Sequence, residues 1–169
     1  TLVVNDVHQR VSGFAPIIKS SLDATRPCTI IDMSSVYAGQ LAKAQRGVAL
    51  LADASALIQD EVTAPADKAA SVRWTILTQA AITVQDPQCA LLTQTAKHLH
   101  LRILRPASAA FERYDSATPA AAHDSENPGT AQLGFTLDLA AAAQEQVLVQ
   151  IIPHDETPAV HRLCSLAEW

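Results

Sequence analysis

Several side chains in the sequence have types and spacings that could support chemistry. Asp32 stands inside an apolar run, and a buried carboxylate must be paired, hydrogen-bonded or bound to a metal. From the residues alone, a structural hydrogen bond is the favoured role for this carboxylate. Tyr37 and Arg46 follow it, and they either meet as a phenol and a charge across strands or extend separately along apolar surface.

Two further pairs of polar residues are more typical of a solvated surface than of a catalytic or metal site. Adjacent side chains of a strand point to opposite faces, so Asp60 and Glu61 cannot converge for acid–base catalysis. We interpret them as the solvated end of a strand. His98 and His100 share one strand face and could bind a metal, but Arg102 continues that face and favours a polar, solvated surface.

No local signature in the sequence nominates a nucleophile or a cofactor. The chain has no nucleophile elbow, phosphate-binding glycine loop, zinc-protease motif or calcium loop. Its three cysteines are widely spaced and odd in number, which indicates free thiols rather than a disulfide framework.

The elements that carry these residues are predicted to be short strands. The stretch 29–61 predicts three of them, of which the first carries Asp32 and Tyr37, the second opens at Arg46 and the third ends at residues 59–61. The alanine-rich part of this stretch, 38–56, could form a helix on propensity alone. Glycines interrupt it and no N-cap precedes it, so we favour strands.

The rest of the chain shows the same pattern of short strands and turn signals. Further strands are predicted at 1–4, 7–11, 72–77, 81–85, 89–95, 97–105, 111–115, 132–139 and 146–152. The first two predict a hairpin, 12–27, 63–71 and 116–130 predict loops, and about 153–169 predicts an irregular tail. Trp74 is central in its strand and predicted to be buried. The pattern predicts an all-β, antiparallel β-sandwich over one domain, 1–169.

Composition limits the class of protein. Of the 169 residues, 49% are hydrophobic and 17% are charged, which is typical of a globular domain. A net charge of −5 argues against nucleic acid as a partner, because phosphate binding needs a basic surface. No apolar run approaches the ~20 residues of a membrane span. The chain starts without Met inside a strand-like run, which indicates a piece of a longer protein.

The order of several motifs resembles the C-terminal β-sandwich portion of bacterial heparinase II/III-like polysaccharide lyases. The motifs are the opening TLVVND followed by Gln9, then Asp32, Tyr37, Arg46 and Asp60-Glu61, then Val72-Arg73-Trp74, and Leu99, Leu101, Ile103, Leu104 and Pro106. The resemblance covers most of the chain and rests on the order and spacing of these motifs together.

The resemblance implies a fragment of a larger enzyme, in which a helical toroid precedes a supersandwich-like β-sandwich. Such enzymes cleave uronic-acid glycans by β-elimination, using a Tyr or His base, an Asn or His that neutralises the carboxylate, and a Tyr acid. Most of these groups would lie upstream of Thr1. Tyr37 is the one candidate catalytic residue in this chain, so the fragment alone is expected to be inactive.

The resemblance also implies cofactors and partners for the parent protein. A zinc or calcium ion is often held by an upstream His, an Asp and a second His; Asp32 could match the Asp. The second His is replaced by the segment 76–78, so we expect no cofactor in this chain. The implied partners are an acidic polysaccharide, the N-terminal helical domain and a homodimer partner, in the periplasm or outside the cell.

Two other functions remain open from the sequence. The chain could be a non-catalytic β-sandwich module that binds carbohydrate or serves as a packing platform. It could also be an independent metal-dependent enzyme. The polysaccharide is equally open, because heparan sulfate, alginate and other uronates are all compatible with the resemblance.

Overall fold

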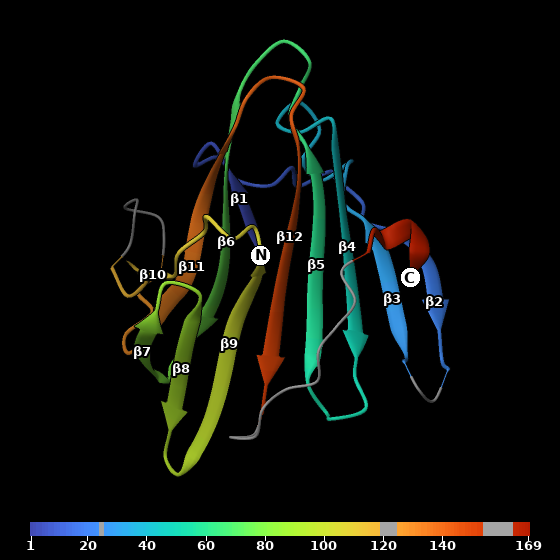
Figure 1. Ribbon diagram of the computed structural model, residues 1–169. Helices are drawn as coiled ribbons and strands as arrows, with labels where there is room; N and C mark the ends of the chain where they lie inside the picture. Colours follow the sequence, from blue (N-terminus) through green and yellow to red (C-terminus); the bar gives the residue numbers. More distant parts are fainter. Residues whose placement is uncertain (24–25, 119–124, 154–163) are drawn as a thin grey trace.

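The chain forms two antiparallel β-sheets that pack face to face (Figure 1). The structure is a computed structural model that describes residues 1–23, 26–118, 125–153 and 164–169. Within this part of the chain, the only helical element is a 3-10 turn, η1, at Leu166–Glu168, and no helix is long and apolar enough to cross a membrane. The predicted antiparallel β-sandwich is therefore confirmed, and 38–56 is not helical.

The two sheets differ in size. The smaller has the order β1 (Leu2–Val4), β6 (Ala70–Thr78), β11 (Ala131–Leu139) and β10 (Glu112–Asp115). The larger has the order β2 (Ile17–Ser21), β3 (Cys28–Asp32), β4 (Lys43–Leu50), β5 (Ala56–Thr63), β12 (Gln144–Ile152), β9 (Lys97–Arg105), β8 (Cys89–Gln94) and β7 (Ala81–Asp86). Each sheet therefore joins segments that are far apart in the sequence.

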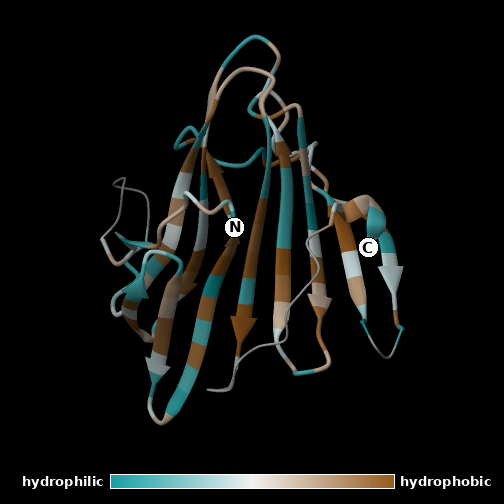
Figure 2. Cartoon of the chain, viewed as in Figure 1, coloured by the Kyte–Doolittle hydropathy of each residue, from teal (hydrophilic) through white to brown (hydrophobic). Residues whose placement is uncertain are grey.

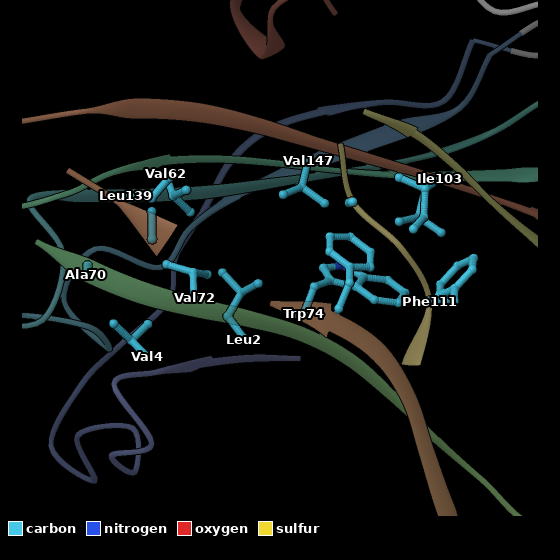
Figure 3. Packing of buried hydrophobic residues seen from close by; sticks show 14 of the residues in the cluster. Leu2, Val4, Val62, Ala70, Val72, Trp74, Ile103, Phe111, Leu139 and Val147 are labelled. Carbon is cyan, nitrogen blue, oxygen red and sulfur yellow. The ribbon is translucent and has the colours of Figure 1, made fainter. Parts of the chain in front are cut away.

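The main core lies between the sheets. Val72 and Trp74 alternate along β6 and face Val147 and Ile103 of the larger sheet (Figure 3). Trp74 is 2% exposed and stacks on Phe135 with 5.6 Å between ring centroids, as its central position in a strand predicted. Figure 2 shows the alternation of hydrophobic and hydrophilic residues along β9 that places one face of that strand in this core.

A second apolar cluster covers the outer face of the larger sheet. The C-terminal residues Leu166 and Trp169 pack there on Ile30, Leu57 and Leu148. A Cβ on Gly47 would collide with the side chains of both C-terminal residues, so this close approach requires glycine. The end of the predicted irregular tail is thus a packed element, while residues 154–163 of that tail lie outside the described residues.

The N-terminal predictions were partly wrong. Residues 7–11 form no strand, because β1 pairs with β6 and only Val7 makes an isolated bridge to Val4. The expected loop 12–27 contains β2, which pairs with β3. Its two isoleucines were a strand signal that the flanking glycine and prolines obscured.

The strands of 29–61 exist but have different bounds. β3 ends at Asp32, so Tyr37 lies in the turn that follows it, and β4 opens at Lys43 rather than at Arg46. β5 continues to Thr63, which puts residues 59–61 in the middle of a strand. The other predicted strands match observed ones to within two residues at each end.

Candidate functional site

Arg46 and Asp60 form a buried ion pair in the larger sheet. They lie directly opposite each other on β4 and β5. The Arg46 Nε and Nη2 groups donate to the two Asp60 carboxylate oxygens at 2.7 and 2.8 Å. The Asp60 side chain is fully buried and that of Arg46 is 18% exposed. Burial alone would lower the pKa of Arg46, but the charge and hydrogen bonds of Asp60 raise it above its ordinary value.

This pair corrects the interpretation of Asp60 and Glu61 as a solvated strand end. Asp60 alternates with Ile58 and Val62 on the face that meets the main core. Arg46 lies on the same face of the neighbouring strand, β4, directly opposite Asp60. Each charged residue stands at an apolar-facing position of its strand, but the register of β4 against β5 is what brings the carboxylate and the guanidinium together as a buried pair.

Glu61 points to the opposite face, as adjacent strand residues must. Its Oε1 accepts a hydrogen bond from the Leu166 backbone N–H at 2.7 Å. Its other oxygen lies 3.7 Å from the Lys43 Nζ. The two carboxylates do not converge, and Glu61 serves to hold the C-terminal turn on the sheet.

Tyr37 lies in the turn after β3 and is 1% exposed. Its hydroxyl donates to the Leu2 carbonyl at 3.0 Å and accepts a hydrogen bond from Gln9 Nε2. Burial raises the pKa of Tyr37, although Gln9 and the charge of Arg46 oppose the shift. The phenol is therefore protonated at neutral pH, where it is a poor base.

We call Tyr37, Arg46, Asp60 and the Leu2 carbonyl the buried cluster, and the exposed residue Gln9 reaches it through its side-chain amide. The hydroxyl bonds of Tyr37 go to the N-terminal segment, while the guanidinium bonds of Arg46 go to Asp60. The arrangement ties the N-terminal segment to the turn after β3, beside a neutralised ion pair. A neutral phenol beside an internally neutralised ion pair can hold structure, but it offers no base or nucleophile ready to react.

Asp32 is held by its own turn. Its Oδ1 accepts from the Ser34 backbone N–H at 2.9 Å. Hydrogen bonds from the Ser34 side chain and backbone, opposed by slight burial and aided by Gln45, lower the pKa of Asp32. No group of three or more His, Cys, Asp or Glu side chains that could hold a metal occurs in the described residues. A hydroxyl and an amide beside one carboxylate do not fit a zinc site, so no chemistry is assigned to a metal here.

The histidine pair lies on β9, apart from the buried cluster. His98 is exposed and its Nδ1 lies 3.3 Å from the Thr93 hydroxyl, while His100 is half-buried. The prediction of free thiols is confirmed, because Cys28, Cys89 and Cys164 are all unpaired.

A large cavity lies along the outer face of the smaller sheet, and we call it the outer groove. It has a volume of about 1290 Å³ and is lined by side chains from β6, β10, β11 and the segment after β1. Arg73 pairs there with Asp6 at 2.7 Å, and its guanidinium lies 5.2 Å from the centre of the Tyr114 ring. Sequence reasoning missed this groove, although the polar run Glu112–Asp115 on a short strand was a signal for it.

Solved structures of lyases contain the same architecture. The crystal structure of heparan sulfate lyase HepC from Pedobacter heparinus matches 94% of this chain with a TM-score of 0.71 and 13% identity. The chain has a fold found in heparinase III. A heparinase III with methylated lysines matches 92% of the chain with a TM-score of 0.71 and 14% identity, and another heparinase III matches 93% with a TM-score of 0.71 and 11% identity.

The extent of the match limits what it shows. This chain covers 24%, 23% and 24% of those three lyase chains. No protein-family model matches the sequence, and no curated protein matches it. The comparison with heparinase III therefore establishes the fold, and the activity of a longer protein is a matter for proposal.

Proposed function

We propose that this chain is the β-sandwich domain of a bacterial polysaccharide lyase that cleaves uronic-acid-containing glycans by β-elimination. The observation that carries the proposal is the match of 94% of the chain, at a TM-score of 0.71, to a heparan sulfate lyase. The motif order in the sequence supports the same family independently of the fold.

The chemistry is proposed to reside mainly on the rest of the longer protein. β-Elimination needs a base, an acid and a group that neutralises the uronate carboxylate, all in one geometry. Within the described residues, Tyr37 is the only candidate that the resemblance nominates. Because its hydroxyl is buried, protonated and bonded to Leu2 and Gln9, we propose that it positions the start of β1 rather than transferring a proton.

The proposal includes a helical domain that packs on the sandwich, and export to the periplasm or beyond. Large apolar side chains near β2 support the first part, because such exposed groups mark interaction surfaces. Phe14 is 73% exposed, Ile17 65% and Leu22 95%. The homodimer and the location follow from the resemblance alone.

The experiment is a screen of the longer protein against uronic-acid polysaccharides, including heparan sulfate and alginate. β-Elimination leaves an unsaturated uronate, which absorbs in the ultraviolet. Appearance of that absorbance on one polysaccharide is the expected result. Binding without any such product would instead favour the non-catalytic carbohydrate-binding module, which the outer groove supports as the second candidate.

A further inference from the structure

A second cavity lies at one end of the sandwich, and we call it the end pocket. Its volume is about 600 Å³, and sites for small molecules typically have volumes of ~300–1,000 Å³. The hairpin of β8 and β9 reaches past the point where β6 of the smaller sheet ends at Thr78 (Figure 1). Thr78 and the hairpin both line the cavity, so the end pocket lies where the two sheets stop covering each other.

The inner wall of the end pocket is apolar. Leu92 of β8 and Leu99 of β9 lie directly opposite each other and line it. Ala80, in the bend between β6 and β7, lines it as well. Leu92 belongs to the main core and is 4% exposed, whereas Leu99 and Ala80 are half-buried and pack against that core. The main core therefore continues into the pocket as an apolar surface that can take up an aliphatic chain.

The mouth of the end pocket carries one lysine and no opposing carboxylate among the described residues that line it. Lys97 and Gln94 lie opposite each other, two residues beyond Leu99 and its partner, so alternation places both on the face that Leu99 shares with the pocket. His98, at the rim, alternates to the other face of β9. Lys97 and Gln94 are exposed, and within the described ranges of the chain their side chains have no hydrogen bond or ion pair.

The spacing and charge of these side chains select a class of ligand. A strand rises about 3.4 Å per residue, so Lys97 stands about 7 Å beyond Leu99 along β9. A ligand that reaches both residues needs a charged group at one end and an apolar chain of at least this length. A monoanion is neutralised by one ammonium group, whereas a dianionic phosphate would keep an excess charge beside an apolar wall. A carboxylate on an aliphatic chain meets both conditions.

We propose that the end pocket binds a small carboxylate that carries an aliphatic chain. The chain lies against Leu92, Leu99 and Ala80, and its removal from water supplies most of the affinity. The carboxylate accepts charge-assisted hydrogen bonds from the Lys97 ammonium group, and the Gln94 amide is a second donor. This binding activity lies outside the lyase proposal and does not depend on it.

The test is an NMR titration of the 169-residue chain with octanoate, hexanoate and octyltrimethylammonium, each kept below the concentration at which it forms micelles. We expect octanoate to shift the methyl signals of Leu92, Leu99 and Ala80 saturably. Hexanoate lacks two methylene groups and should bind about tenfold more weakly, because each methylene adds to the buried apolar area. The cation has the same chain as octanoate and should bind more weakly than octanoate. Equal affinity for the cation, saturable shifts only at other residues, or no binding of octanoate would overturn the proposal.

Two lysine variants locate the carboxylate. Lys97→Gln removes the charge at an exposed position that the fold does not need, and loss of an exposed ion pair predicts about threefold weaker octanoate binding. Lys68→Gln is the matched control, because Lys68 is also exposed but lies before β6, at the opposite end of that strand from Thr78, where it donates to the Gly39 carbonyl. We expect this control to bind octanoate as the parent chain does. Unchanged affinity of the Lys97 variant, or an equal loss in the control, would contradict the site.

Discussion

The interior of this sandwich and its outer surface use the same three side-chain types in opposite ways. We call Arg46, Asp60 and Tyr37 the inner trio, and the set Arg73, Asp6 and Tyr114 the outer trio. In the buried cluster, Arg46 meets Asp60 beside Tyr37, and the Asp60 side chain has no exposed surface. In the outer groove, Arg73 meets Asp6 beside Tyr114, and the Asp6 side chain is 79% exposed. The closest nitrogen–oxygen distance is 2.7 Å in both ion pairs.

The difference lies in what the surroundings allow each trio to do. A buried pair cannot lose one partner without leaving an unpaired charge in a low dielectric, so Arg46 and Asp60 are fixed in their arrangement. An exposed pair exchanges partners with water and ligands at little cost. Burial therefore makes the inner trio a structural element and leaves the outer trio available for recognition.

The largest expected effect is on stability when the inner pair is broken. Asp60→Asn leaves the Arg46 guanidinium buried without its counter-charge, which should lower the free energy of unfolding by about 3–5 kcal/mol. Asp6→Asn is the matched change in the outer pair, and Asn tolerates the positive φ of 53° at that position. Denaturant titration should show a loss of at most about 1 kcal/mol for this control. Similar losses in the two variants would remove the distinction between the trios.

Removing the buried Tyr37 hydroxyl should also cost more stability than removing the Tyr114 hydroxyl near the surface. Tyr37→Phe leaves the Leu2 carbonyl and the Gln9 amide without their partner, at a cost of about 1–3 kcal/mol in unfolding free energy. Tyr114→Phe removes a hydroxyl near the surface and should change stability by no more than about 0.5 kcal/mol. A Tyr37 variant as stable as the parent protein would show that the buried cluster does not hold the N-terminal segment.

Alkaline pH should test the burial of the Tyr37 hydroxyl. The pKa of Tyr37 is raised above its ordinary value of 10.0, mainly by burial, so the folded state prefers the protonated phenol. This stabilisation is complete below about pH 10 and is lost as the pH rises through the folded-state pKa. Unfolding measured across that range should show a decline in stability that is smaller in Tyr37→Phe. An identical decline in that variant would assign the effect to other groups.

The smallest effect is that of salt. The exposed Arg73–Asp6 pair should be screened, so its contribution of at most about 1 kcal/mol should shrink as ionic strength rises. The buried Arg46–Asp60 pair should be insensitive to the same change. A double-mutant cycle at low and high salt for each pair measures this, and a strong salt dependence of the inner pair would contradict its burial.

The fold was largely predictable because strand alternation is a local signal. Lys97–Arg105 was predicted to the residue, since its leucines and isoleucine alternate with polar side chains. Ile17–Ser21 was missed, because it is an edge strand whose isoleucines stay exposed and whose pairing with Cys28–Asp32 depends on distant residues. Residues 7–11 were predicted as a strand on local propensity. The hairpin partner that this strand needed, β1, pairs with β6 instead.

The candidate site was less predictable than the fold. Tyr37 and Arg46 were singled out correctly as residues of interest, but their partners come from distant segments, Leu2, Gln9 and Asp60. Asp60 was read as a strand end because polar residues close many strands. Only the register of β4 against β5 shows that it meets Arg46.

Our main proposal is that this chain is the supporting sandwich of a polysaccharide lyase whose reacting groups lie mainly on the rest of a longer protein. The direct test compares turnover by the 169-residue chain with turnover by the longer protein on the same uronic-acid polysaccharide, followed by the absorbance of the unsaturated product. We predict turnover by the longer protein and none by the chain alone, because a single buried, protonated phenol cannot supply base, acid and carboxylate neutraliser together. Product formation by the 169-residue chain above the uncatalysed rate would contradict the claim and place the catalytic groups within it.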